Sequence, residues 1–316
     1  MEAGSTPRCY NGFEMVTYLN GRFVEDADAT ISVRARALNY GIGCFGGIRG
    51  YAADDGKQVY VFRLDQHVER MRLSAKLIMM DLTVTPAKLK DIVVELLRKN
   101  DVHHDVYVRP LVFSGSTELS PVLRAEDSAL AVYCLPLKRY IDKEATNVCV
   151  SSWRRVADNA IPARAKPTAA YLNSALARRE AVDNGFDEAI FLTERGTVSE
   201  GSAEHVFIVK NGALVSPPST EDNLDGITRR TLMTLATEDL GLAVQERVIG
   251  RTELYTADEM FLCGTGAEVT PVASVDRRPI GSAKPGPVTS RLKTHFEDVV
   301  RGRVDARKSW LTPVWG

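Results

Sequence analysis

The stretch EAIFLTERGTVSEGSAEHVFIVKNGALV, residues 188–215, carries the clearest strand pattern of the 316-residue chain. Asn211 and Gly212 stand between two apolar runs, which is the signature of a type I′ hairpin turn. An earlier turn at residues 194–196 predicts that the whole stretch forms an antiparallel meander. The same Asn-Gly pair at residues 20–21 predicts another hairpin near the N-terminus.

Helical signals are interleaved with these strand signals. In the clearest helix, residues 86–99, apolar side chains recur at helical spacing after a Thr85 cap and a first-turn proline. The other predicted helices span residues 64–80, 169–183, 228–240 and 287–300. Because helices and strands are mixed without strict alternation, the sequence predicts an α+β fold and not a doubly wound parallel sheet.

The length of the chain suits two domains. A polar stretch over residues 137–144 interrupts two apolar strand runs, at 130–135 and 148–152. We therefore expect an N-terminal α/β domain over residues 1–135, an interdomain linker over 136–146 and a C-terminal domain over 147–316.

Composition narrows the functional classes. Forty basic and 41 acidic residues give a formal net charge of -1, which does not favour nucleic acid or an anionic membrane as a partner. No apolar run is long enough to span a bilayer, and the first residues lack an apolar signal core. Five scattered cysteines predict a reducing compartment, so we expect a cytoplasmic protein. The spacing of the five histidines predicts no metal site.

Lys166 lies among small residues just before the helix expected at 169–183. Small neighbours allow a planar cofactor to approach the backbone, and lysine forms imines with aldehydes. On this segment alone a solvated loop lysine is the simpler interpretation.

Three other segments are compatible with an anionic, ring-shaped ligand. Thr228 begins a helix, whose free N–H groups suit a phosphate, and the small-residue turn at 263–267 can direct its N–H groups at an anion. Glu200 is an acid that could pair with a ring nitrogen. Taken singly, a helix cap, a tight turn and a solvated acid are the simpler interpretations.

These segments occur in the order typical of one family. The chain resembles the fold-type IV pyridoxal-phosphate (PLP) enzymes, most closely the branched-chain amino acid aminotransferases, from about residue 16 to the C-terminus. The matching motifs are RALNYG (36–41), CFGGIR (44–49), VFR (61–63), YVRPL (107–111), SSW (151–153), VSEG (198–201), GITR (226–229) and GTGAEVTPV (264–272). The resemblance implies a two-domain fold like that of D-amino acid aminotransferase, with the site between the domains, and a homodimer whose partner loop closes the pocket.

The resemblance also implies a role for each matching residue. Lys166 matches the lysine that carries PLP as a Schiff base and moves the substrate proton. The other cofactor residues are Glu200 on the pyridine nitrogen, Tyr171 on the phenolic oxygen, Leu224 on the ring face, and Arg63, Ile227, Thr228 and Thr265 on the phosphate. The substrate residues are Tyr40, Phe45, Tyr107 and Arg109, with Gly266 and Ala267 offering amides to the substrate carboxylate. For Phe45, core packing is an equal alternative.

The implied activity is amino transfer between a branched-chain or other hydrophobic L-amino acid and 2-oxoglutarate. The chain departs from the branched-chain pattern at Gly46, where an acid is usual, and at Ala169, Ala170, His205 and the 114–121 loop. These departures keep open a specialised aminotransferase, a D-amino acid or (R)-amine transaminase, and aminodeoxychorismate lyase. A non-catalytic binding protein of the same fold is a further alternative.

Overall fold

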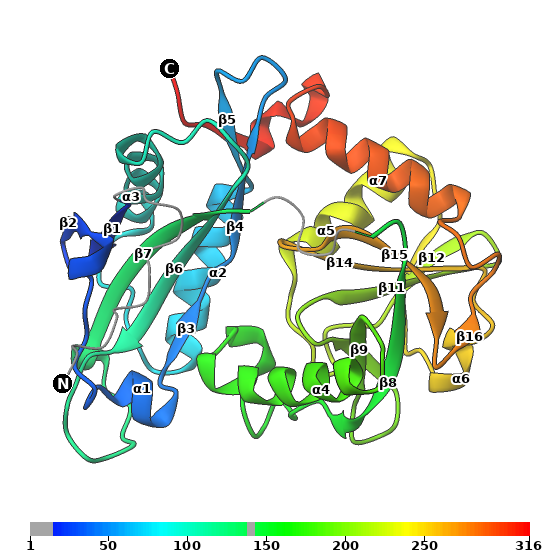
Figure 1. Ribbon diagram of the computed structural model, residues 1–316, viewed down its shortest axis with the longest axis horizontal. Helices are drawn as coiled ribbons and strands as arrows, with labels where there is room; N and C mark the ends of the chain where they lie inside the picture. The colour runs from blue at the N-terminus through cyan, green and yellow to red at the C-terminus, as the bar shows by residue number, and fades with distance from the viewer. Residues whose placement is uncertain (1–14, 138–142) are drawn as a thin grey trace, which may run out of the picture.

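The computed structural model describes residues 15–137 and 143–316, which build two β-sheets with helices packed against them (Figure 1). The mixture of helices and sheets confirms the predicted α+β class.

The first sheet is antiparallel throughout its described strands. Its order is β17-β5-β4-β6-β7-β1-β2, with β3 paired to β6. The strands are β1 (Val16–Leu19), β2 (Arg22–Glu25), β3 (Gly43–Phe45), β4 (Ile48–Ala52), β5 (Val59–Phe62), β6 (Val106–Ser114), β7 (Ser128–Pro136) and β17 (Leu311–Pro313). Helices α2 (Leu64–Leu77) and α3 (Pro86–Lys99) bury their apolar stripes against it, and α1 (Arg36–Tyr40) lies at the lower ends of β3 and β6 in Figure 1.

The second sheet has the order β10-β9-β8-β15-β14-β11-β12-β13, with β16 paired to β15. Its strands are β8 (Thr146–Arg154), β9 (Glu188–Leu192), β10 (Val198–Gly201), β11 (His205–Lys210), β12 (Ala213–Ser216), β13 (Val244–Glu246), β14 (Glu259–Gly264), β15 (Glu268–Val275) and β16 (Arg278–Pro279). The pairs β8–β9, β8–β15 and β12–β13 are parallel, so this sheet is mixed.

The helices of the second half are α4 (Tyr171–Asp183), α5 (Ile227–Thr234), α6 (Arg251–Leu254) and α7 (Pro287–Val300). Short turns complete the described chain: η2 (Asp26–Asp28), η3 (Ala125–Asp127), η4 (Ala163–Ala165), η5 (Thr168–Ala170), the π-turn η6 (Leu235–Asp239) and η7 (Asp305–Trp310). No described helix has the length and apolar character needed to cross a bilayer.

Both predicted hairpins are confirmed. Asn20 and Gly21 have φ values of 45° and 96°, and Asn211 and Gly212 have 50° and 74°, as a type I′ turn requires. The predicted meander over 188–215 is wrong in its middle. The chain turns sharply after β10, where the Gly201 amide donates to the Glu204 carbonyl at 2.6 Å. Strand β10 then stays beside β9, while β11 pairs with β14 and β12.

The predicted helix at 86–99 is confirmed with its Thr85 cap. The helix predicted at 228–240 begins one residue earlier and changes to a π-turn after residue 234. Strand β7 ends at Pro136 and β8 begins at Thr146, but residues 138–142 of the predicted linker lie outside the described residues. The division into domains stays a prediction.

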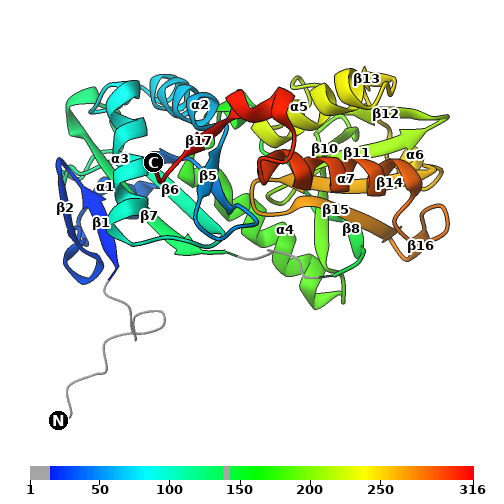
Figure 2. The same ribbon diagram turned by 90° about the horizontal axis from the view of Figure 1, so that it is seen from above.

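The end of the chain returns to the first sheet. Helix α7 covers the second sheet, and β17 then adds a strand beside β5, with Leu311 opposite Phe62 (Figures 1 and 2). The last residues therefore fasten the two sheets together. Of the five cysteines, Cys44, Cys134, Cys149 and Cys263 are buried and unpaired, and Cys9 lies outside the described residues.

A buried acid pair lies between α4 and the second sheet. Glu204 and Glu188 are both buried, and Arg178 forms an ion pair with Glu188. Burial, and next the charge of Glu188, raises the pKa of Glu204 to about 8. The folded protein thus holds a proton at Glu204 that the unfolded chain releases above its ordinary pKa of 4.5.

This proton makes stability depend on pH. A raised folded-state pKa gives stability that is fully present below about pH 4.5 and is lost as the pH rises toward 8. We expect Glu204→Gln, which stays neutral, to unfold at a temperature several degrees above wild type at pH 9. At pH 5 the advantage should largely disappear.

The measurement is thermal unfolding from pH 5 to pH 9. Glu194→Gln, at an exposed turn acid, is the control and should show a difference from wild type that stays constant with pH. An equally constant difference for Glu204→Gln would refute the buried proton.

Candidate functional site

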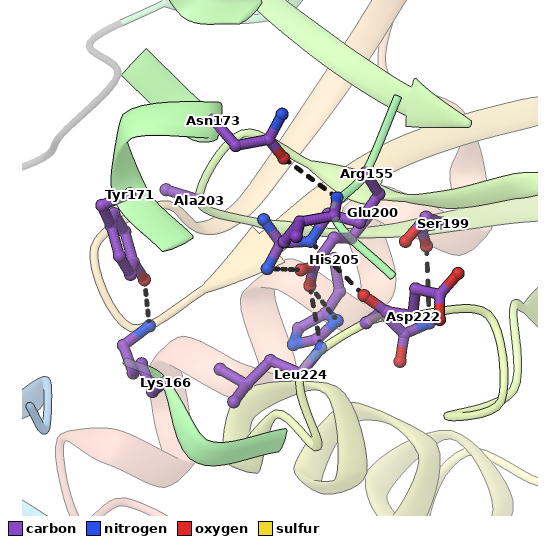
Figure 3. A network of polar contacts seen from close by, with 12 residues as sticks. Arg155, Lys166, Tyr171, Asn173, Ser199, Glu200, Ala203, His205, Asp222 and Leu224 are labelled. Carbon is purple, nitrogen blue, oxygen red and sulfur yellow. Dashed lines mark hydrogen bonds and ion pairs between the residues drawn. The ribbon is translucent and has the colours of Figure 1, made fainter. Parts of the chain in front are cut away.

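Lys166 follows η4 in a left-handed backbone conformation, with φ 46°. This turn directs its amine across to α4, where Nζ donates a hydrogen bond to the Tyr171 hydroxyl at 2.7 Å (Figure 3). The Lys166 carbonyl accepts from the Phe45 amide at 3.2 Å, which ties this loop to β3 of the first sheet. The lysine is therefore held at the junction of the two sheets.

The surroundings of Lys166 favour a neutral amine. Burial, and next the charge of Arg70, lowers the pKa of Lys166 to about 8. Burial raises the pKa of the Tyr171 hydroxyl to about 12. Tyr171 therefore remains a neutral hydroxyl. About a tenth of Lys166 is unprotonated at pH 7, far more than for an ordinary lysine, and this fraction is able to act as nucleophile or base.

Aromatic and cationic side chains from the first sheet lie beside Lys166. Lys166 Nζ is 5.2 Å from the centre of the Phe45 ring, and that ring is 4.7 Å from the Tyr171 ring. Arg109 lies 4.5 Å from the Phe45 ring and donates to the Tyr107 hydroxyl at 2.9 Å. Phe45 is thus part of the buried core, and its ring also lines the space next to the Lys166 amine.

Glu200 lies across from the Lys166–Tyr171 pair and is buried at the end of β10 (Figure 3). Its carboxylate is 2.9 Å from an Arg155 nitrogen and accepts the Leu224 amide at 3.2 Å (Figure 3). Burial raises the pKa of Glu200, and the Arg155 charge opposes that rise. Arg155 in turn donates to the Asp222 carbonyl at 3.3 Å, so one arginine connects β10 to the 222–224 loop.

His205 closes the network from β11. Its Nδ1 is 3.6 Å from a Glu200 oxygen, and burial holds the pKa of the ring well below its usual range, so the ring is neutral. Gly226, which precedes α5, lies against the ring: a Cβ at this position would be 2.0 Å from His205 Nε2. The His205 ring therefore occupies the space that a side chain at residue 226 would need.

Several groups suited to an anion surround the start of α5. Ile227 and Thr228 form its buried first turn, where the backbone N–H groups are free of helical partners. Arg63, at the start of α2, has a buried Nε without a hydrogen-bond partner among the described residues. Burial, and next the charges of Arg307 and Arg230, lowers the pKa of Arg63 to about 10, which leaves it charged at neutral pH.

The remaining predicted residues lie around this centre. Thr265, in the turn between β14 and β15, donates to the Gly47 carbonyl at 3.2 Å and so joins the second sheet to the first. Gly266 and Ala267 follow it in the same turn. Tyr40 is 39% exposed at the end of α1, beside Gly41, which packs on Ala169.

The structure shows the surroundings of two positions at which the chain departs from the branched-chain pattern, Gly46 and the 114–121 loop. A Cβ at Gly46 would lie 2.7 Å from Pro110 Cγ, so the proline ring occupies the space beside this glycine. The 114–121 loop is held by Arg36, which is fully buried and pairs with Glu118 and Asp127. The described residues contain no cluster of three or more His, Cys, Asp or Glu side chains suited to a metal.

Sequence reasoning missed two residues of the site. Arg155 comes two positions after the recognised SSW motif, and a charged residue just beyond a strand end was its only signal. Trp310, whose ring centre is 3.5 Å from the guanidinium carbon of Arg63, gave no local signal, because it lies 247 positions further along the chain.

Comparison with known proteins identifies the family. The model of the family "Amino-transferase class IV" matches residues 43–275. The chain belongs to the class IV aminotransferases. It is therefore an enzyme of amino-group transfer, as its resemblance implied.

Individual relatives are similar over nearly their whole length. A protein of Aquifex aeolicus, described as "Probable branched-chain-amino-acid aminotransferase", is 42% identical over 94% of this chain and 96% of its own. The crystal structure of a branched-chain aminotransferase from Thermoproteus uzoniensis with norvaline has a TM-score of 0.90 at 40% identity, covering 95% of this chain and 99% of its own. The T.th. branched-chain amino acid aminotransferase complexed with N-(5'-phosphopyridoxyl)-L-glutamate has a TM-score of 0.90 at 38% identity, and it also covers 95% of this chain and 99% of its own.

The close approach of Gly226 to His205 generates a prediction. We expect Gly226→Ala to lower stability by about 1–3 kcal/mol, because the new methyl group overlaps the buried imidazole. In a His205→Ala background the same change should cost much less. Thermal unfolding of the four proteins in this cycle measures the coupling.

Gly250→Ala is the matched control. Gly250 precedes α6 with the same φ of -78° as Gly226, but its Cβ would meet no atom within 4 Å. It should therefore be tolerated in either background. A cost for Gly226→Ala that is the same with and without His205 would contradict the packing described above.

Proposed function

We propose that this aminotransferase uses PLP to move the amino group between a branched-chain or other hydrophobic L-amino acid and 2-oxoglutarate. The observation that carries the proposal is the placement of the Lys166–Tyr171 pair between two sheets, facing a buried Glu200 that Arg155 holds. The likeness to enzymes crystallised with norvaline and with a phosphopyridoxyl-glutamate compound supports the choice of cofactor and of both substrates.

The residues present fit PLP. Arg63, with its unpartnered Nε, and the first turn of α5 would hold the phosphate, together with Thr265. Glu200 would face the ring nitrogen, Tyr171 the phenolic oxygen, and Leu224 the ring face. When bound, PLP supplies a carbonyl that accepts amino groups and a ring that withdraws electrons.

Lys166 would perform both the attachment and the proton transfer. Its lowered pKa, about 8, keeps part of the amine neutral at physiological pH, which both tasks require. Tyr171 Oη holds Nζ in place at 2.7 Å, and Phe45 shields the amine from water. The base is therefore positioned before substrate arrives.

Glu200 would control the charge on the ring nitrogen. Burial alone favours the protonated acid, whereas Arg155 at 2.9 Å favours the carboxylate. Against a protonated ring nitrogen, Glu200 would gain a second positive partner, which would shift that balance further toward the carboxylate.

The substrate side combines a cation with apolar walls. Arg109, braced by Tyr107 and Phe45, is suited to a carboxylate. The Gly266 and Ala267 amides, in the turn between β14 and β15, would add further donors. Phe45 and Pro110 leave the neighbourhood of Gly46 apolar, which favours a hydrophobic side chain. In the second half-reaction the same cation would receive an acidic substrate.

A substrate panel tests the proposal. Purified enzyme with PLP should transfer amino groups from leucine, isoleucine and valine to 2-oxoglutarate with ping-pong kinetics. Lys166→Ala should lower the rate by about a thousandfold or more, because both nucleophile and base are lost. Lys88→Ala, at an exposed lysine of α3, is the control.

The panel also includes D-amino acids, primary amines and aminodeoxychorismate. A clear preference for any of these over the branched-chain L-amino acids would overturn the substrate part of the proposal. Full activity of Lys166→Ala would overturn the catalytic part.

We also propose a homodimer, supported by apolar side chains left in solvent around the site. Leu119, in the 114–121 loop, is 92% exposed. Val33 and Leu38, close to Tyr40, and Leu172, next to Tyr171, are exposed too. Burying them against a second copy removes an energetically costly surface.

The unpaired cysteines support a cytoplasmic location.

Analytical ultracentrifugation should therefore give twice the chain mass of 34.8 kDa. Leu119→Asp combined with Leu172→Asp should shift the protein toward the monomer, because charges would enter an apolar interface. Val248→Asp, at an exposed apolar residue after β13, should leave the mass unchanged. A monomeric wild type would refute the dimer.

A further inference from the structure

The last residues of the chain cover the guanidinium of Arg63. The Arg63 guanidinium carbon lies 3.5 Å from the centre of the Trp310 ring, well within cation–π range. The backbone amide of Arg63 also donates to the Trp310 carbonyl at 2.7 Å. Trp310 thus contacts Arg63 through both its main chain and its side chain.

Trp310 is itself fixed from two sides. Its ring meets Phe62 edge to face, with centres 6.4 Å apart, and β17, which begins at the next residue, pairs with β5. The Arg307 guanidinium lies 4.6 Å from the same ring and forms ion pairs with Glu238 and Asp239. The indole therefore has little freedom to leave Arg63.

Arg63 needs such support because its own position is constrained. It adopts a left-handed backbone conformation, with φ 52°, at the start of α2. Its Nε is buried without a hydrogen-bond partner among residues 15–137 and 143–316, and Arg307 and Arg230 add positive charge nearby. Arg63 is half-buried, and a guanidinium whose Nε is shielded from water in this way is compensated by an anion or an aromatic face.

We propose that Trp310 is a positioning residue that holds Arg63 ready for the cofactor phosphate, so that the C-terminal segment belongs to the phosphate site. The inference rests on the proposed use of PLP. The indole face lies against the Arg63 guanidinium, whose N–H groups remain to donate to an anion. Holding the guanidinium in place in this way removes much of the ordering cost from phosphate binding.

Cofactor affinity provides a direct test, separate from activity. We expect Trp310→Leu to raise the dissociation constant for PLP about tenfold, equal to about 1.4 kcal/mol. Trp310→Phe should weaken PLP binding by only about two- to threefold, since a smaller aromatic face remains. Pyridoxal, which lacks the phosphate, should bind all three proteins equally. Equilibrium dialysis of the full-length apoenzymes gives each constant.

The coupling to Arg63 separates positioning from general damage. Arg63→Gln should weaken PLP binding, and adding Trp310→Leu should then cost little more. Trp315→Leu is the matched control: this tryptophan stacks on His103, with centres 4.6 Å apart, and donates to the Val102 carbonyl. It should lower the unfolding temperature without changing the PLP constant.

The possible outcomes are distinct. An unchanged PLP constant in Trp310→Leu, or an equal loss for PLP and pyridoxal, overturns the role of Trp310. If Trp310→Leu does not fold, Trp310→Phe decides, with an expected loss of about two- to threefold for PLP alone. If wild type fails to attach PLP to Lys166, as judged by borohydride reduction and peptide mass, both the proposed function and the proposed role of Trp310 are refuted.

Discussion

The buried ion pair between Arg155 and Glu200 is the interaction on which the site depends. A carboxylate inside a protein costs several kcal/mol unless it is paired and hydrogen-bonded. Here Arg155 comes from just after β8, Glu200 from β10, and the Leu224 amide from the loop before α5. Satisfying this one acid therefore sets the relative positions of three segments, and it leaves a negative group facing the Lys166 side of the site (Figure 3).

The Lys166 loop and the first sheet together supply the complementary part. Lys166 and Arg63 both adopt left-handed backbone conformations, which turn their side chains away from the direction of the adjoining elements. Phe45 and Trp310 then pack against the two cations. The result is an excess of positive charge beside aromatic faces, which is an environment that favours a phosphorylated, planar and negatively charged ligand.

Local signals in the sequence predicted the framework well. Both Asn-Gly hairpins, the helix at 86–99 and the α+β class depend on interactions between near neighbours, and the structure has them. The meander over 188–215 was wrong because pairing of β11 with β14 involves residues about 55 positions apart. Lys166, Tyr171 and Glu200 were recognised only by their order along the chain. Any one of them alone is an ordinary loop or turn residue.

The sequence by itself determined which residues were available for the site. They are a lysine, a tyrosine, an acid, an arginine and a helix N-terminus suited to a phosphate, and they occur in a family-specific order. Only the tertiary structure decided which side chains support them. Arg155 pairs with Glu200, His205 fills the space of Gly226, and Trp310 covers Arg63. These contacts join residues from 21 to 247 positions apart. Such distances are bridged by sheet pairing and core packing, and no local periodicity or propensity encodes them.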